Sequence, residues 1–139
     1  SADAAGALWT GVTYSAHPVG AAATVACLSE TLRLDTRTNA AARGTQLYEG
    51  VKRLAEKHDI IGDVRGGHGL MCGIEIVSDR AARTPMDAAT MQRIHQATYE
   101  AGAMVRLGAQ NILMSPPLVI SEAEIDVILA ALDAGFSAV

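Results

Sequence analysis

The sequence predicts an α+β fold, with a small, mostly antiparallel sheet and helices packed on one side of it. Two observations lead to this expectation. Four segments carry apolar residues at helical spacing, and the segments between them contain short apolar runs bounded by Gly and Pro, as strands do. The chain has 139 residues, half of them hydrophobic and 19% charged, so it is long enough to bury a core.

The first two helices are expected close together in the chain. Residues 18–35 begin with Pro18 at the first helical position, where the missing N–H costs nothing. This segment is apolar on most faces, which predicts a helix buried on several sides. Residues 39–57 place Leu47, Val51 and Leu54 at helical spacing, with charged residues opposite.

The strands follow the second helix. Residues 60–65 lead through a glycine-rich turn into residues 70–77, an apolar run expected to form a central strand. Residues 103–107 and 111–115 are predicted to pair as a hairpin closed by residues 108–110.

Capping signals mark the two remaining helices. Thr84 followed by Pro85 predicts a helix that starts there and ends near Gly102. Ser121 and Glu124 have the spacing of a capping box. The final helix then presents one apolar stripe, formed by Ile125, Ile128, Leu129, Leu132 and Phe136.

Composition and charge exclude several classes of function. The formal net charge is −4 and no run of Lys or Arg exists, which argues against a nucleic-acid partner. No apolar run reaches membrane-spanning length. Cys27 and Cys72 are expected to be buried, reduced thiols, which suits a cytoplasmic protein, and their spacing predicts no metal site.

The turn from Gly11 to His17 is the strongest candidate for a binding site. It is rich in Gly and hydroxyl-bearing residues and runs directly into a helix. Such a turn can hold an anion through hydroxyls and backbone N–H groups. The alternative is that the Thr13 hydroxyl only caps the turn.

Three segments resemble the C-terminal portion of class III (omega-type) aminotransferases, which use pyridoxal phosphate (PLP). Residues 13–19 are similar to the family's Thr-Tyr-Ser-Gly-His-Pro, with Ala16 where Gly is frequent. Residues 62–75 are similar to its Val-Arg-Gly…Gly-Leu-Met-x-Gly-Ile-Glu run, with one extra residue between Arg65 and Leu70. Residues 105–126 are similar to its Arg-Pro-x-Gly, Pro-Pro-Leu and Glu-Ile-Asp ending, with Leu107 where Pro is frequent.

The resemblance implies the C-terminal small domain of a fold-type I PLP-dependent enzyme. Residues 1–36 would be a turn and connecting helix from the large domain, and residues 37–139 the small domain. The intact enzyme would transfer an amino group between an amine or amino acid and a keto acid or aldehyde. This chain would be a fragment of it, inactive alone.

The resemblance also assigns roles to three residues. Thr13 would bind the PLP phosphate in the neighbouring subunit's site, which implies a homodimer. Tyr14 would line the cofactor pocket, or pack as an ordinary aromatic. Arg106 would bind a substrate carboxylate through two parallel hydrogen bonds, or lie in water or in a structural ion pair.

No catalytic residue is expected in the chain. Its two lysines, Lys52 and Lys57, fall on the wet face of a predicted helix, whereas the family's Schiff-base Lys and its acidic partner lie upstream of the Thr13 segment. Arg65 is expected in a structural ion pair, and His58 and His95 on solvated helix faces. A non-catalytic binding or oligomerisation module, and a PLP-dependent racemase or aminomutase, remain alternatives.

Overall fold

The structure is a computed structural model that describes residue 11 and residues 13–139. The chain divides into two compact units, one ending at Leu34 and the other running from Asp35 to Val139. Each unit is described by itself. No helix within the described residues combines the length and apolarity needed to cross a membrane.

The first unit contains helix α2 (Pro18–Arg33), with Pro18 at its start as predicted. None of its residues is buried, and large apolar side chains such as Val19, Leu28 and Leu32 are exposed. The expectation of a helix buried on several sides is therefore wrong for the described chain. Burial needs a partner surface as well as an apolar helix, and the described part of this unit holds only a turn and α2.

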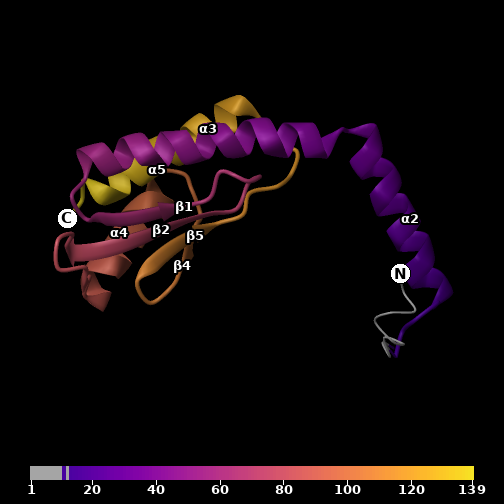
Figure 1. Cartoon of the computed structure of the whole chain (residues 1–139), viewed down its shortest axis with the longest axis horizontal. Coiled ribbons are helices and arrows are strands. Elements are labelled where there is room, and N and C mark those ends of the chain that lie inside the picture. The colour runs from indigo at the N-terminus through magenta and orange to yellow at the C-terminus, as the bar shows by residue number, and fades with distance from the viewer. Residues whose placement is uncertain (1–10, 12) are drawn as a thin grey trace, which may run out of the picture. The chain divides into compact units, whose positions relative to one another are not determined.

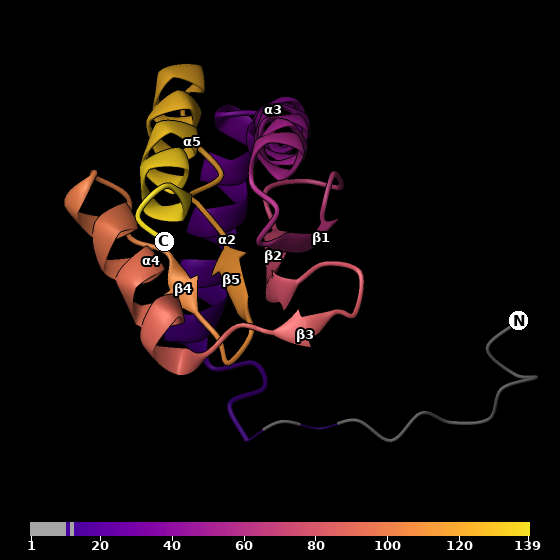
Figure 2. The ribbon, with the colours of Figure 1, turned by 90° about the vertical axis from the view of Figure 1, so that its left-hand side faces the viewer.

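The second unit is the α+β fold that the sequence predicts. Its four main strands form one sheet in the order β1-β2-β5-β4, every neighbouring pair is antiparallel, and the short β3 pairs with β2. Figures 1 and 2 show α3 and α5 side by side over one face of the sheet, with α4 next to α5 near β4. In chain order the elements are α3 (Thr36–Lys57), β1 (Ile61–Arg65), β2 (Cys72–Asp79), β3 (Thr84–Pro85), α4 (Ala88–Glu100), β4 (Arg106–Leu107), β5 (Asn111–Met114) and α5 (Glu122–Phe136).

The core lies between this sheet and its helices. Side chains alternate between the two faces of a strand, so Cys72, Ile74 and Ile76 of β2 share the face that the helices cover. Ile74 is paired with Ile112 of β5, and neither side chain is exposed to solvent. The final helix contributes Ile125, Leu132 and Phe136 to the same cluster.

Two of the predicted helix ends are confirmed, and one predicted helix start is wrong. The Ser121–Glu124 capping box is present, and Gly102 follows α4 with φ of 107°. Thr84 and Pro85, however, form strand β3 instead of opening a helix. Asp87 caps α4, where its side chain accepts from the Thr90 N–H at 3.0 Å; Pro85 fits a short edge strand because an edge tolerates a missing donor.

Two further expectations about side chains are corrected. Cys72 is buried as predicted, but Cys27 is exposed on α2. His58 is largely buried, and its Nε2 lies 2.6 Å from an Asp133 carboxylate oxygen. Lys57 Nζ binds the same carboxylate at 2.7 Å. Both residues therefore tie the end of α3 to α5, His58 from a largely buried position and Lys57 from an exposed one.

Candidate functional site

The candidate site lies on the sheet face opposite α3 and α5. Arg65 is paired with Gly73, Gly73 with Leu113, and Leu113 with Arg106. Directly opposed residues share a face, so these four form one row across β1, β2, β5 and β4. Three strand spacings of about 4.8 Å put the backbones of the two arginines about 14 Å apart.

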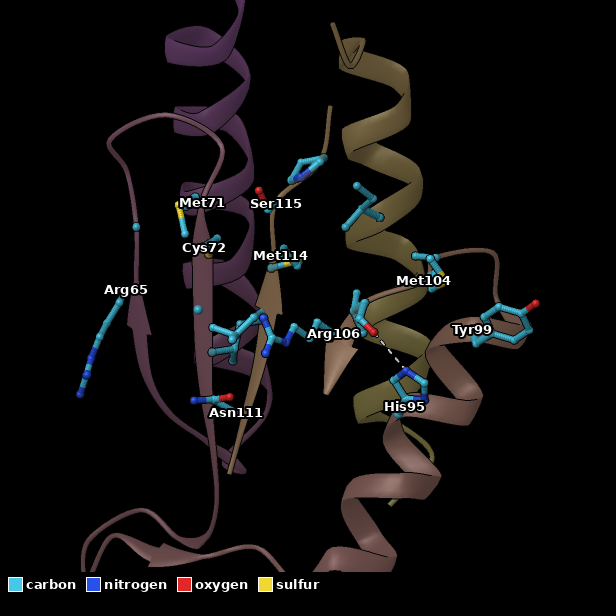
Figure 3. Close-up of a pocket in the computed structure, with 18 of the residues that line it drawn as sticks. Arg65, Met71, Cys72, His95, Tyr99, Met104, Arg106, Asn111, Met114 and Ser115 are labelled. Atoms are coloured by element: carbon cyan, nitrogen blue, oxygen red, sulfur yellow. Dashed lines mark hydrogen bonds between the residues drawn. The ribbon is translucent and has the colours of Figure 1, made fainter. Parts of the chain in front are cut away.

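A cavity of about 1240 Å³ runs along this face and around the β4 edge to α4. Its lining includes both arginines of the row, together with side chains from α4 and from the segments that flank the strands. Gly73 leaves the middle of the row without a side chain. Figure 3 shows residues of β1, β2, β5, β4 and α4 around this space.

The two arginines of the row differ in their partners. Arg65 Nε donates to Asp63 Oδ2 at 2.9 Å, which confirms the expected structural ion pair. This hydrogen bond is the main reason that the pKa of Asp63 is lowered and that of Arg65 raised. Figure 3 shows Arg65 pointing away from the other labelled side chains. Its charge is already neutralised.

Arg106 has no such partner. Its side chain is exposed, and among the described residues no hydrogen bond or ion pair engages its guanidinium. Figure 3 shows it extending from β4 across the neighbouring strand β5. A planar guanidinium grips a carboxylate with two parallel hydrogen bonds, so this residue offers the cavity an available anion-binding group.

The other polar groups of the open face do not compete for that role. Glu75, next along β2 on the same face, is bonded to Arg83. Cys72 belongs to the covered face but also lines the cavity. Burial raises the pKa of its thiol to about 11, so at neutral pH it is a thiol and not a nucleophilic thiolate. Within the described residues, no group of three or more His, Cys, Asp or Glu side chains is placed to hold a metal ion.

His95 reaches the same cavity from α4. Its Nε2 lies 3.0 Å from the carbonyl oxygen of Val105, the residue before Arg106, and the ring is half-buried. The expectation of a solvated His95 is therefore wrong. The available signal was its place in the helix, because it directly follows Ile94, a residue of the buried stripe, and so lies at the border of that stripe.

The Thr13 turn belongs to the first unit. Thr13 and Ser15 are exposed, and the His17 N–H donates to the Tyr14 carbonyl at 3.1 Å. His17 stands at the N-cap of α2 without a side-chain cap, so the first free N–H groups of α2 remain available. Tyr14 is 79% exposed and touches the His17 ring edge-on.

This donor set fits a phosphate group. Neutral hydroxyls and backbone N–H groups at a helix N-terminus suit a dianion. Neither of the chain's two lysines, Lys52 and Lys57, lines the cavity. Lys57 binds Asp133, and Lys52 lies over the Tyr48 ring.

Comparison with known proteins points to one family. The family model described as "Aminotransferase class-III" matches residues 2–135. A taurine–pyruvate aminotransferase of Bilophila wadsworthia is 36% identical over 134 residues, which are 91% of this chain and 29% of the relative. The alanine–glyoxylate aminotransferase 2 homolog 2 of Arabidopsis thaliana is 37% identical over 128 residues, 90% of this chain and 26% of the relative.

Solved structures agree. A PLP-bound amine transaminase from an uncultivated Pseudomonas species superposes with a TM-score of 0.84 and 38% identity, over 94% of this chain and 30% of that one. An (S)-enantioselective omega-transaminase from Thermomicrobium roseum superposes with a TM-score of 0.81 and 36% identity, over 97% of this chain and 30% of that one. The chain therefore spans less than a third of the length of these relatives.

Proposed function

Because this chain belongs to the class III aminotransferases, we propose that it supplies the substrate-carboxylate site and part of the phosphate site of a PLP-dependent aminotransferase. The enzyme would move an amino group from an amine or amino acid to a keto acid. The observation that supports this most is the Arg106 guanidinium, which has no partner among the described residues and lies in a cavity whose other arginine is paired with Asp63.

Each residue has a defined task in this proposal. PLP, when bound, supplies the electron sink that lets an amino group leave one substrate and pass to the next. Thr13 donates its hydroxyl and N–H to the phosphate, with Tyr14 beside it, in the site of the neighbouring subunit of a homodimer. Arg106 binds the carboxylate of the acceptor and orients its carbonyl carbon. The Schiff-base lysine comes from outside this chain.

A keto acid fits Arg106 better than a simple aldehyde. Pyruvate and glyoxylate, the acceptors in the names of two relatives, carry a carboxylate next to the carbonyl. A bidentate pair with that carboxylate fixes the position of the reacting carbon as well as adding affinity. An aldehyde without a carboxylate gains nothing from Arg106.

The test of this role is Arg106→Ala in the enzyme that carries this chain. A lost charge-assisted hydrogen bond costs about 1.5–3 kcal/mol, so kcat/KM for pyruvate should fall about 10- to 100-fold. The value for a carboxylate-free aldehyde should stay within about twofold. Arg65→Ala is the matched control, because it removes a guanidinium of the same row that Asp63 already occupies. Equal losses with both acceptors would contradict the assignment.

The phosphate role of Thr13 has its own test. Thr13→Ala removes one hydroxyl donor and should speed the loss of PLP on dialysis, measured by the absorbance of the retained cofactor. Thr13→Ser restores the hydroxyl and should restore retention. If Thr13→Ala keeps PLP as well as the unaltered enzyme does, Thr13 is not a phosphate ligand.

A further inference from the structure

We infer that His95 is a positioning residue for Arg106, because its ring fixes the peptide that joins Val105 to Arg106. The inference rests on the proposed role of Arg106 and extends it to a residue outside the sheet. The observation behind it is the His95 Nε2 to Val105 oxygen contact at 3.0 Å, drawn as the dashed line in Figure 3.

The strand that carries Arg106 needs such support. β4 has only two residues and is the last strand of the main sheet, so the ladder to β5 holds it on one side alone. The outer side of an edge strand leaves backbone groups without ladder partners. A strand this short, held from one side, has little to fix the direction in which Arg106 leaves it.

The Val105 carbonyl is the backbone group that His95 satisfies. Val105 is only 7% exposed, and a buried carbonyl requires a hydrogen-bond partner. A carbonyl oxygen can only accept, so His95 Nε2 is the donor. In the neutral ring this requires the tautomer that carries its proton on Nε2.

The helix that carries His95 is a firm anchor. The neighbouring Ile94 is fully buried, and α4 packs along α5. The segment that leads to β4 is also bonded to the end of α4, because the Ala103 N–H donates to the Thr98 carbonyl at 3.2 Å. Arg106 therefore follows a stretch held to α4 at two points, Ala103 and Val105.

The consequence concerns the substrate carboxylate. The Val105 carbonyl and the Arg106 N–H belong to one planar peptide, so holding the first also fixes the second and the start of the Arg106 side chain. A displacement of about 1 Å in a positioning group is enough to weaken a reaction severely. His95 touches neither substrate nor cofactor in this proposal and acts only through Arg106.

The test compares two His95 variants in the PLP-loaded enzyme that carries this chain. His95→Phe keeps the ring volume and removes the donor, whereas His95→Gln places an amide N–H near the position of Nε2. We expect His95→Phe to raise KM for pyruvate about 3- to 10-fold, with KM for a carboxylate-free aldehyde unchanged. His95→Gln should recover most of the affinity for pyruvate.

The controls separate positioning from general damage. Gln92→Leu changes an exposed side chain on the same helix and should leave both KM values as they are. If His95→Phe does not fold, His95→Leu takes its place. Equal rises of KM for both acceptors, no rise for pyruvate, or no rescue by His95→Gln would each overturn the inference.

The outcome is distinct from that of the proposed function. If Arg106→Ala discriminates between the acceptors and His95→Phe does not, the carboxylate role stands and only the positioning role falls. If Arg106→Ala itself shows no discrimination, the proposed function fails, and the positioning role fails with it.

Discussion

The two faces of the sheet are built from alternate residues of the same strands, yet they have different physical tasks. On the covered face, Ile74 and Ile112 are fully buried under the helices. On the open face, the row from Arg65 to Arg106 borders a cavity. Residues that stabilise the fold and residues that line the candidate site therefore alternate along each strand, because neighbouring side chains point to opposite faces.

The open face also shows how charge is distributed. Two of its acidic side chains form ion pairs, Asp63 with Arg65 and Glu75 with Arg83. Arg106 is left without a partner among the described residues. Of the two arginines in the row, Arg106 is therefore the one whose guanidinium stays available to an anion.

The largest effect expected from this comparison comes from two neighbouring residues of β5. Ile112 is fully buried on the covered face, and Leu113 is 38% exposed on the open one. Ile112→Ala should lower the free energy of unfolding by about 2–5 kcal/mol, because it removes buried methyl groups and leaves a cavity. Leu113→Ala should cost about 1 kcal/mol, because much of its side chain stays in water.

Urea unfolding of the chain, followed by circular dichroism, measures both values. The two variants have the same host strand and similar changes in volume, so each serves as the other's control. Equal losses of stability would mean that the open face contributes as much to folding as the covered one, and the separation of tasks would be wrong.

Most of the fold could be predicted because its signals are local. The spacing of Leu47, Val51 and Leu54 marks the inner face of α3, and Ser121 with Glu124 marks the start of α5. The hairpin around residues 108–110 follows from the apolar runs on either side of it. Each signal depends on residues close in sequence, so a single sequence is enough to predict the element.

The features that the sequence does not predict depend on tertiary contacts or strand pairing instead of on helical spacing. His58 meets Asp133, which is 75 positions away, and His95 meets a backbone carbonyl, which no sequence pattern displays. Thr84 and Pro85 carry a helix-start signal, but pairing with β2 decides their structure. In the candidate site, the family resemblance points to Arg106. That Arg65 is paired with Asp63 while Arg106 has no partner among the described residues is visible only in the structure.

The smallest expected effect concerns the contact between α3 and α5. There the Asp133 carboxylate is bonded to Lys57, which has the larger influence on it, and to His58. These hydrogen bonds lower the pKa of Asp133 below its ordinary value, which is about 3.9. A carboxylate whose pKa is lowered by folding stabilises the folded chain at pH values above its ordinary pKa. This stabilisation is lost as the pH falls through the lowered pKa. Because Lys57 is largely exposed, Asp133→Asn should cost only about 1 kcal/mol or less at pH 7.

The pH dependence separates this contact from simple packing. The difference in stability between Asp133→Asn and the unaltered chain should shrink on acidification and vanish below the lowered pKa, as measured by urea unfolding at a series of pH values. Glu49→Gln, which removes an exposed carboxylate from α3, is the control and should show no such trend. A difference that stays constant down to low pH would mean that the carboxylate's shape, and not its charge, joins α3 to α5.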